Sequence, residues 1–502
     1  MLGVVLGAVV SLCCERRAAY SVRVLTRFST FLRFSQTGCA AMVVMLGAWG
    51  AAVRTRAQEA DPARGGTPPT GTRFLESSPQ RPGDPLRGYE YLVHGDYVSS
   101  GVPLEIYRQA AGPAVADLGR SGAASGVSYR FNVVQSAEGV PVVAPNCLTC
   151  HAERLQGRLV VGLGNNSDDH TARTSVPVMA AAMATTLKYG PDSPEAKSYA
   201  PILRSHQAIG PLITTHVRGV NPADKIFAAL AAHRNAADLS WRPVSQFDVP
   251  VATVPTDVPA WWLLKKKNAL YYNGLGRGDF ARLSSASGML TMKDSLEADR
   301  MDVRFPDVMA WIRTLEAPAY PHPIPPEQTT RGRILFEKKC ASCHGTYGAQ
   351  ETYPNLLVSL DTIGTDPLLS QSYTQNPEYH TWYNESWYGQ GPYAGRLEPN
   401  DGYVAPPLDG VWATAPYLHN GSVPTLEDLL NSPQRPTFWK RNFQNDDYDE
   451  AMGGWRYETM TEGGDSRIYD TTRPGYGNGG HEFGDLFTAD ERKAVIAYLQ
   501  SL

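Results

Sequence analysis

Two short stretches, Cys147-Leu-Thr-Cys150-His151 and Cys340-Ala-Ser-Cys343-His344, determine how this chain can fold. In each Cys-x-x-Cys-His motif both thiols can form thioethers to one haem, and the His that follows is placed to ligate its iron. A zinc site or a redox dithiol would use the cysteines but would not need a His directly after each pair. The motifs therefore predict two covalently attached haem c groups, with His151 and His344 as iron ligands.

Length and composition limit the architecture. A chain of 502 residues is too long for one ordinary domain and has ample mass to bury a core around each cofactor. Its 46 Gly and 38 Pro residues favour long ordered loops. We expect a mainly α protein with little β structure, in which two cytochrome c-like domains wrap long loops around two covalent haems.

The charge balance bears on the partners. With 46 basic and 50 acidic residues the formal net charge is −4, which gives no electrostatic argument for nucleic acid or for an anionic membrane surface. We expect the partners to be a small-molecule oxidant or organic substrate, and a small redox protein as a possible electron donor.

Residues 1–57 have the pattern of a signal peptide. Three arginines precede an apolar run, Cys39–Val53, and Thr55-Arg56-Ala57 is a small-x-small cleavage pattern. The run is short for a membrane span, which needs about 20 apolar residues, although an uncleaved anchor stays an alternative. A second apolar run, Met1–Cys14, suggests a start codon assigned too far upstream. We expect no membrane span after processing.

The residues after the cleavage pattern, 58–85, are rich in Pro, Gly, Arg and Asp and are expected to form a disordered leader. The cysteines outside the two motifs, Cys13, Cys14 and Cys39, all precede the cleavage pattern. A mature chain would therefore use every thiol for haem. Because bacteria attach haem c outside the cytoplasmic membrane, we expect a periplasmic or secreted protein.

The second motif lies in a local frame typical of cytochrome c. Helical spacing predicts a short helix over Thr330–Lys339 that ends at the motif, and Thr488–Leu502 begins with a capping signature and continues as an amphipathic helix. A helix before the motif and a helix that closes the domain indicate a C-terminal cytochrome c domain over 323–502.

The first motif repeats this plan more loosely. Phe305–Leu315 has one apolar helical face, like the last helix of the chain, and five prolines in Pro318–Pro326 predict a stiff linker. Val142–Pro145, just before the motif, indicates a strand or extended approach instead of a helix. We expect an N-terminal cytochrome c-like haem domain over 86–322.

A further similarity supports duplication. Trp262–Gly274 and Trp412–Gly421 share Trp, Ala, Tyr and Asn-Gly in the same order. Matching the two Asn-Gly pairs aligns Tyr271 with Leu418 and Tyr272 with His419. Two unrelated aromatic turns are the alternative.

The sequence resembles the bacterial di-haem cytochrome c peroxidase superfamily. Ala415-Pro-Tyr-Leu-His-Asn-Gly-Ser-Val-Pro-Thr-Leu is similar to that superfamily's Pro-Tyr-Met-His-Asp-Gly-Ser segment. Gly95–Pro103, Pro259-Ala-Trp-Trp262 and Gly480-His-Glu-Phe-Gly484 resemble its rubber-oxygenase branch. These patterns together cover most of residues 90–502.

The resemblance implies a sixth ligand for the second haem. Where the peroxidases have a ligating Met this chain has Leu418, which cannot bind iron. The rubber-oxygenase-like branch implies His481 in that role, which would give a bis-His, low-spin haem that holds electrons. His419 is the rival ligand, although a structural role is expected for it.

The first haem has His151 beneath it and no obvious partner above. Candidate sixth ligands, each more often a surface or structural His, are His94, His170, His206, His216 and His233. Among these His170 is the best placed, in a polar loop soon after the motif. Without a sixth ligand, the iron at His151 is open to dioxygen or peroxide.

Other side chains are weaker candidates. By resemblance Trp262 is an inter-haem bridge, although most Trp residues only fill a core. Lys265–Lys267 could dock a redox partner or pair with haem propionates, and Arg277 and Arg282 are similar propionate candidates. Calcium is possible, as in related peroxidases, but no loop pattern specifies it.

These observations leave three functions open. One is an oxidoreductase of haem peroxidase or dioxygenase type, with His151 and Trp262 as catalytic residues and the second haem as an electron store. Another is a periplasmic electron-transfer cytochrome with two six-coordinate haems and no substrate chemistry. The third is a structural or sensory subunit of a larger complex.

Overall fold

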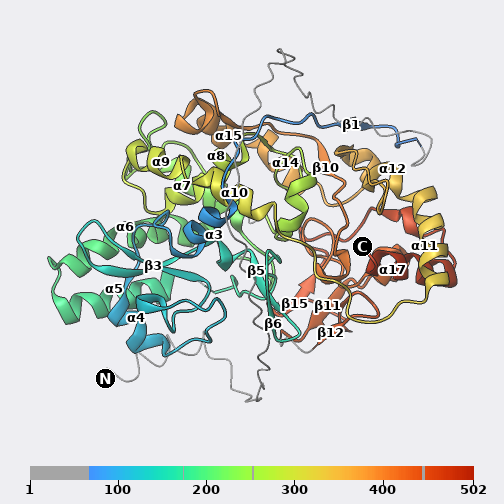
Figure 1. The fold of residues 1–502 in the computed structure, drawn as a ribbon, viewed down its shortest axis with the longest axis horizontal. Coiled ribbons are helices and arrows are strands. Elements are labelled where there is room, and N and C mark those ends of the chain that lie inside the picture. The colour runs from blue at the N-terminus through green and yellow to red at the C-terminus, as the bar shows by residue number, and fades with distance from the viewer. Residues whose placement is uncertain (1–66, 173–174, 251–253, 444–446) are drawn as a thin grey trace, which may run out of the picture. The chain divides into compact units, whose positions relative to one another are not determined.

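The computed structural model describes residues 67–172, 175–250, 254–443 and 447–502 (Figure 1). The predicted signal peptide over 1–57, with Cys13, Cys14 and Cys39, lies outside the described residues, as does the first part of the predicted leader. Everything described belongs to one unit, Ala60–Leu502. Among the described residues, none of the helices combines the length and the apolar character that a membrane crossing requires.

The expected fold class was wrong. The chain is about 39 % helix and 14 % strand, and the strands form several small antiparallel sheets of two or three strands each. Short ladders therefore hold part of the Gly- and Pro-rich chain, between its loops. Strands of two to five residues are too short to show a clear alternation of apolar and polar residues, so the sequence pattern did not reveal most of them.

The described end of the predicted leader, 67–85, is part of the fold. Strand β1 (Thr72–Phe74) pairs with β8 (Leu356–Ser359), which also pairs with β10 (Gly402–Val404). Arg81 forms buried ion pairs with Asp279, at 3.0 Å, and Asp302, at 2.7 Å. This part of the leader is therefore anchored by a ladder and by charge, which its composition did not indicate.

One core surrounds the first motif. Helix α3 (Pro85–His94) packs against α10 (Phe305–Ile312), which confirms the helix predicted there. The predicted extended approach to Cys147 is confirmed as β4 (Pro141–Pro145), the central strand of a sheet with β2 (Val102–Pro103) and β3 (Phe131–Gln135). Between α3 and α10 the chain also forms α4 (Leu104–Ala111), β5 (Ala152–Leu155), β6 (Arg158–Val161), α5 (Ser175–Tyr189), α6 (Pro194–Ile209), α7 (Ala223–Ala232), α8 (Phe280–Ser285) and α9 (Ser295–Asp302).

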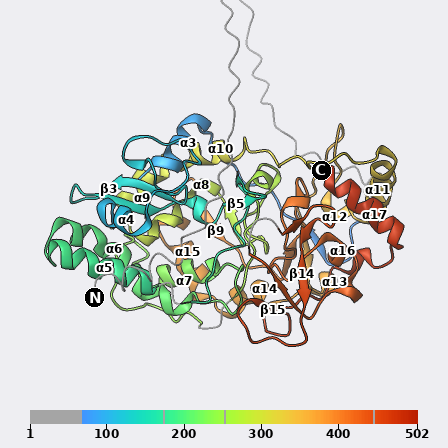
Figure 2. The same cartoon turned by 90° about the horizontal axis from the view of Figure 1, so that it is seen from below.

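A second core surrounds the second motif. Helix α11 (Pro326–Lys339) lies along α17 (Ala489–Gln500), as both views show (Figures 1 and 2), and both predicted helices are confirmed. The expected capping box is present between Thr488 and Glu491. The remaining elements are α12 (Ala341–His344), α13 (Leu360–Ile363), α14 (Leu368–Gln375), α16 (Leu426–Leu429), β11 (Phe438–Arg441), β12 (Tyr448–Asp449), β13 (Gly454–Trp455), β14 (Tyr457–Thr459) and β15 (Ile468–Asp470).

Part of the later sequence folds into the first core. Strand β9 (Gly395–Leu397) pairs with β7 (Gly276–Gly278), and Trp382 and Tyr383 of α15 (Glu378–Glu385) pack within the core around the first motif. The chain thus crosses back over the boundary expected near 322. The limits 86–322 and 323–502 stay predictions.

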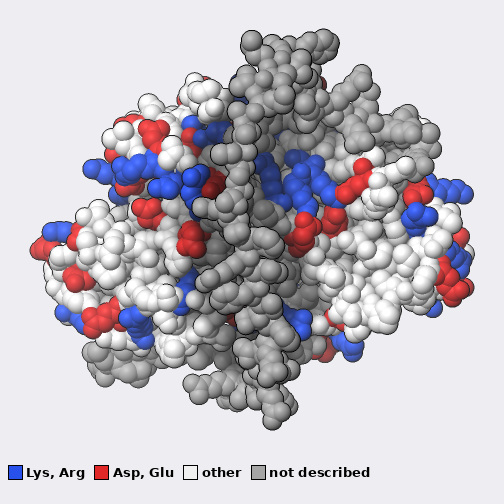
Figure 3. Space-filling view, in the orientation of Figure 1, with Lys and Arg blue, Asp and Glu red and all other residues white. Residues whose placement is uncertain are grey.

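Charges of both signs are interspersed over one face of the molecule (Figure 3). On the face shown in Figure 3 small groups of acidic side chains lie beside the basic ones, and the largest basic group is in the upper middle of that view. Uncharged residues cover much of the rest of this face.

Candidate functional site

The second motif lines an internal cavity. Helix α11 ends at Lys339, and the next residues carry Cys340, Cys343 and His344 to the wall of a cavity of about 220 Å³. Most of the lining is apolar, and includes Phe336, Val358, Leu408, Val411, Leu418, Leu426, Leu429, Leu430, Phe483, Val495 and Leu499. An apolar cavity with two thiols and an imidazole in its wall fits a covalently bound haem.

A second imidazole faces the motif across this cavity. His344 Nδ1 lies 2.8 Å from the Pro406 carbonyl oxygen, to which it can donate, and this leaves Nε2 to bind a metal. The rings of His344 and His481 have centroids 6.1 Å apart and planes inclined by 62°. Two imidazoles that bind one metal ion from opposite sides, with bonds of about 2 Å each, have centroids roughly 6 Å apart. The spacing of the pair suits a shared iron, and His481 stays the predicted sixth ligand.

His481 is held in an unusual backbone conformation. Its φ of 49° is in the left-handed region, which costs free energy for a residue with a side chain. The Arg435 guanidinium donates to the carbonyl oxygens of Asn478, Gly480 and His481, and the His481 N–H donates to the Ile363 carbonyl at 2.7 Å. Arg435 thus fixes the loop that presents the second imidazole, a role that the sequence did not indicate.

Burial keeps the titratable groups of this site uncharged near neutral pH. Burial, with a smaller effect of His344, lowers the pKa of His481 to about 3, so the imidazole is neutral and able to ligate. Its Nδ1 is buried with no hydrogen-bond partner in the described structure. Burial raises the pKa of Cys340 to about 12, and the four described cysteines form no disulfide.

The Leu418-His419 pair lies in the same cavity wall. Leu418 contributes only apolar surface, while the His419 ring stacks on Tyr403 with a centroid distance of 4.0 Å. The His419 carbonyl accepts a hydrogen bond from the Asp257 N–H at 2.8 Å, but its Nε2 has no partner in the described structure. Stacking on Tyr403 favours the structural role expected for His419.

Asp257 and Tyr272 add a hydrogen-bonded polar pair to the cavity wall. The Tyr272 hydroxyl donates to Asp257 at 2.7 Å, and both residues line the cavity. Burial raises the pKa of Asp257 to about 7, although the bond to Tyr272 opposes the shift. Asp257 can therefore hold a proton near neutral pH beside the second haem site.

The first motif is reached from a strand. After β4, Asn146 caps the short 3₁₀ helix Cys147–Thr149 by accepting from the Leu148 N–H at 2.9 Å. The Cys147 N–H donates to the Tyr97 hydroxyl at 3.2 Å, and the Asn221 amide lies 3.6 Å from the Cys150 sulfur. Burial raises the pKa of Cys147 to about 11. Both thiols are therefore half-buried and held next to defined polar partners.

His151 stacks on an indole. Its ring lies 4.5 Å from that of Trp261, with planes inclined by 19°. Burial lowers the pKa of His151 to about 3, and the backbone of Pro259 opposes the shift. The Nδ1 atom of His151 has no hydrogen-bond partner among the described residues. The imidazole is neutral and is suited to bind iron.

The sequence pattern pointed to Trp262, but the structure places its neighbour Trp261 against His151. Trp262 is 1 % exposed, donates from Nε1 to the Asp409 carbonyl at 2.8 Å, and belongs to the core around the second motif. Trp261 belongs to the core around the first motif. Two adjacent residues thus place one indole in each core. The pair of Trp residues in Pro259–Trp262 was the sequence feature that could have indicated a role for Trp261.

The predicted internal duplication is visible in the backbone. Leu270 pairs with Gly276 by two backbone hydrogen bonds, and Tyr417 pairs with Val423 in the same way. These residues occupy matching positions when the two Asn-Gly pairs are aligned. The two loops are therefore copies of one structure and not unrelated aromatic turns.

Backbone angles at the matched positions agree as well. Tyr271 and Leu418 have φ of 68° and 66°, and Gly274 and Gly421 have φ of 66° and 70°. A side-chain-bearing residue with positive φ is uncommon, so its recurrence at the same place in both loops is specific. The alignment of Tyr271 with Leu418 is thereby confirmed.

Three of the five candidate ligands for the first haem face other partners. His94 is exposed and lies 3.9 Å from Glu90, and His233 Nδ1 lies 3.0 Å from the Arg242 carbonyl oxygen. His216 is exposed beside Tyr476. These three side chains have surface or structural surroundings.

The other two candidates are half-buried. Burial lowers the pKa of both His170 and His206, the latter to about 4, and each has an Nδ1 atom with no partner in the described structure. His170 lies near the ion pair of Arg130 and Asp168, and Arg130 also donates to the Thr149 carbonyl inside the motif. His170 therefore keeps its position as the best placed of the five.

The basic candidates for propionate binding differ in their partners. Lys265 pairs with Glu316 at 2.7 Å and Lys266 with Asp409 at 2.6 Å. Lys267 instead lines the cavity of the second motif, and burial lowers its pKa to about 8. Of these three lysines, only Lys267 lines the cavity. Burial destabilises its positive charge, and a haem propionate beside it would offset that cost.

The two arginine candidates are engaged elsewhere. Arg277 donates to the Glu76 carbonyl at 2.5 Å, and Arg282 pairs with Asp302 at 2.9 Å. For calcium, the described residues hold no group of three or more His, Cys, Asp or Glu placed to bind a metal ion.

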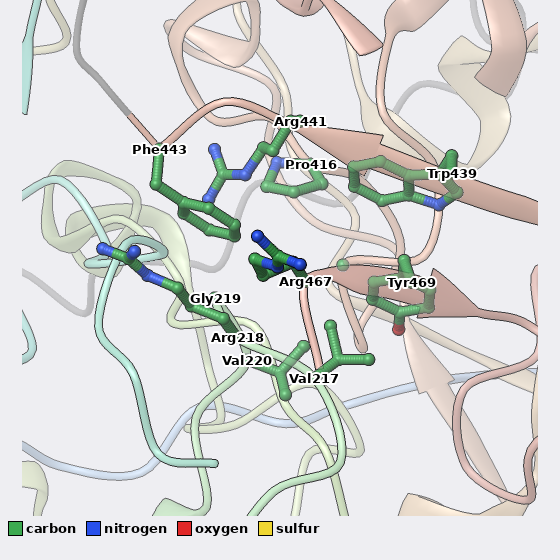
Figure 4. Close-up of a pocket in the computed structure, with 11 residues that line it drawn as sticks. Val217, Arg218, Gly219, Val220, Pro416, Trp439, Arg441, Phe443, Arg467 and Tyr469 are labelled. Atoms are coloured by element: carbon green, nitrogen blue, oxygen red, sulfur yellow. The ribbon is translucent and has the colours of Figure 1, made fainter. Parts of the chain in front are cut away.

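A second, small and basic pocket shares Pro416 with the lining of the cavity of the second motif. Figure 4 shows Arg218, Arg441 and Arg467 around it, with the Phe443 ring between the first two. Arg441 is 5 % exposed, packs 4.0 Å from the Trp455 ring centre, and has an Nη1 atom with no partner in the described structure. The pocket volume is about 10 Å³, which is room for one water molecule and not for a cofactor.

Comparison with known proteins supports the cytochrome interpretation. A family model described as RoxA-like, cytochrome c-like matches residues 402–440, the segment that contains the loop with Leu418 and His419. The chain is therefore related to RoxA-like cytochrome c domains, and such a domain implies covalently bound haem c.

Two proteins of Sinorhizobium fredii, both described as uncharacterized, are also similar. Protein y4iJ is 30 % identical over 240 residues, which are 34 % of this chain and 38 % of that protein. Protein y4iM is 26 % identical over 285 residues, which are 51 % of this chain and 63 % of that protein. The chain covers less than two thirds of the length of either relative.

Proposed function

We propose that this protein is a di-haem c-type cytochrome oxidoreductase of the peroxidase or dioxygenase type. In this proposal the haem at His151 activates peroxide or dioxygen, and the haem at His344 stores or relays electrons. The observation that supports this proposal most directly is that His344 and His151 have different surroundings. His344 faces His481 at 6.1 Å, whereas the ring stacked on His151 belongs to Trp261.

The division of work follows from these surroundings. Haem bound at the first motif would supply redox-active iron with a position open to a small oxidant. His151 holds that group through a neutral, buried imidazole, and Trp261 fixes the plane of the ring. At the second motif His344 and His481 together leave no open position, which suits electron storage.

The adjacent indoles support electron transfer between the sites. Trp261 contacts His151, and Trp262 lies in the core that contains the second cavity. The cavity wall also offers a proton-holding pair, because Asp257 has a pKa near 7 and is hydrogen-bonded to Tyr272. Electrons and protons can therefore be managed beside the second haem, away from the oxidant.

The remaining parts of the proposal concern partners and place. We expect a small-molecule oxidant with an organic substrate, and a small redox protein as electron donor. Thioether attachment of haem takes place outside the cytoplasmic membrane in bacteria, which supports a periplasmic or secreted location.

An electron-transfer cytochrome with two six-coordinate haems is the second candidate. It is favoured by His170, whose buried and unpartnered Nδ1 lies close to the first motif. If His170 ligates the first iron, both haems hold two axial ligands and neither is open to an oxidant.

Electron paramagnetic resonance of the purified ferric holoprotein separates these functions. We expect one high-spin signal from the first haem and one low-spin signal from the second, together with consumption of hydrogen peroxide or dioxygen in the presence of an electron donor. Two low-spin signals in both the oxidised and the half-reduced protein would contradict the oxidoreductase proposal.

A further inference from the structure

The two copies of the duplicated loop carry different side chains at one position. In the second copy Leu418 lines the cavity that also contains His344. In the first copy the same backbone position, with the same positive φ, is Tyr271. An apolar side chain is thus replaced by a phenol at one point of the repeated structure.

The same repeat relates the two motif histidines to these loops. His344 Nδ1 lies at hydrogen-bonding distance from the Pro406 carbonyl oxygen, twelve residues before Leu418. Trp261, which stacks on His151 with ring centroids 4.5 Å apart, lies two residues after Pro259, and Pro259 is twelve residues before Tyr271. Tyr271 is therefore placed relative to His151 as Leu418 is relative to His344.

The exposure of Tyr271 shows that it borders open space. Tyr271 keeps 40 % of its surface accessible, while Ala269 and Asn273 on either side of it are 1 % exposed. Its neighbour Tyr272 points to the second cavity and donates to Asp257. The two adjacent tyrosine side chains therefore border different spaces, and of the two only Tyr272 lines the cavity of the second motif.

The residues near Tyr271 connect it to the first motif. Asp224, at the start of α7, lies close enough to act on the Tyr271 phenol. Asn221, three residues earlier, contacts the Cys150 sulfur at 3.6 Å. The segment 221–224, which leads into α7, therefore extends from the Cys150 sulfur towards the surroundings of Tyr271.

From this placement we infer that the Tyr271 phenol oxygen stands over the sixth coordination position of the iron that His151 binds. A phenol oxygen can ligate haem iron or donate a hydrogen bond to a molecule bound there, and leucine can do neither. The inference rests on the proposed function and adds to it: a small oxidant that enters the first site shares its space with Tyr271.

Cyanide binding to ferric holoprotein tests this placement. Tyr271→Phe keeps the ring and removes the oxygen, so the affinity for cyanide at the first haem should change by about tenfold or more, with a changed high-spin resonance signal. Tyr498→Phe is the matched control, because it removes a hydroxyl of α17, in the core around the second motif, that has no hydrogen-bond partner in the described structure. Its cyanide affinity and high-spin signal should equal those of the wild type.

The outcomes separate this inference from the proposed function. If the wild type binds cyanide and Tyr271→Phe behaves identically, the placement of Tyr271 is overturned and the open first haem stands. If only Tyr271→Phe binds cyanide, Tyr271 ligates the iron, and the open resting site is overturned instead. Absence of cyanide binding and of a high-spin signal in both proteins overturns both.

Discussion

The two motifs are reached and enclosed in different ways within one repeated plan. The second follows helix α11 and faces His481 across a cavity, whereas the first follows strand β4 and has its His151 stacked on Trp261. Both halves still use a leading helix packed on a closing helix. The difference teaches that the shared plan fixes where each motif lies, while the side chains around the motif His would decide what a haem bound there can do.

The largest expected effect is the loss of one haem at a time. Replacing Cys340 and Cys343 by Ser should remove the covalent haem at His344 and leave the other, and replacing Cys147 and Cys150 should do the reverse. Mass spectrometry of the denatured protein counts the attached haems. Retention of two covalent haems in either double variant would contradict the assignment of that motif.

His481→Ala should make the second site resemble the first. Without its second imidazole the iron at His344 loses a strong axial ligand, so its low-spin signal should convert to high spin. Paramagnetic resonance of the ferric protein measures this change. His419→Ala is the control, since its ring stacks on Tyr403, and it should keep the low-spin signal. An unchanged spectrum in His481→Ala together with a change in His419→Ala would reverse the ligand assignment.

The sequence predicted the parts of these sites that lie close together along the chain. Helices α10, α11 and α17 and the strand before Cys147 follow from local periodicity and caps, and the pairing of Tyr271 with Leu418 follows from a shared pattern. The short ladders could not be read, because their strands pair residues far apart and are too brief to alternate.

The site residues that the sequence did not indicate were missed for one physical reason. Trp261, Arg435 and Asp257 act through contacts with residues distant in sequence, such as the Arg435 hydrogen bonds to the loop of His481. No local spacing encodes such contacts. His481 itself was inferred from resemblance, and the 6.1 Å separation from His344 gives that inference a geometric basis.

Two glycines test the plan that the halves share. A Cβ added to Gly332 of α11 would lie 1.9 Å from the Ala494 carbonyl oxygen of α17, and one added to Gly88 of α3 would lie 1.9 Å from the Asp307 carbonyl oxygen of α10. Gly332→Ala and Gly88→Ala should each lower the free energy of unfolding by about 3 kcal/mol, because backbone atoms cannot move aside cheaply. Chemical denaturation measures the loss.

The matched control for these glycine variants is Ile334→Ala, at an exposed position of α11, which should cost less than about 1 kcal/mol. A large loss in Gly332→Ala with none in Gly88→Ala would show that only the second half depends on close helix packing. The shared plan would then be a resemblance of outline alone.

The smallest expected effect concerns the proton at Asp257. Burial raises its pKa from 3.8 to about 7, so between these values the folded protein holds a proton that the unfolded chain has released. Stability from this group is therefore complete below pH 4 and is lost as the pH rises to 7. Asp257→Asn should therefore make the decline in the free energy of unfolding between pH 4 and pH 7 smaller by about 2 kcal/mol, with allowance for partial solvent access.

Chemical denaturation of the holoprotein at several values between pH 4 and pH 8 measures this decline for the wild type and for Asp257→Asn. Asp465→Asn is the control, because that carboxylate is exposed and paired with Arg467, and its variant should keep the wild-type slope over this range. Equal slopes in Asp257→Asn and wild type would show that Asp257 is ionised in the folded protein. In that case the Asp257 carboxylate is charged and accepts the hydrogen bond of the Tyr272 hydroxyl. The wall of the second cavity would then hold no carboxyl proton that distinguishes it from the surroundings of His151.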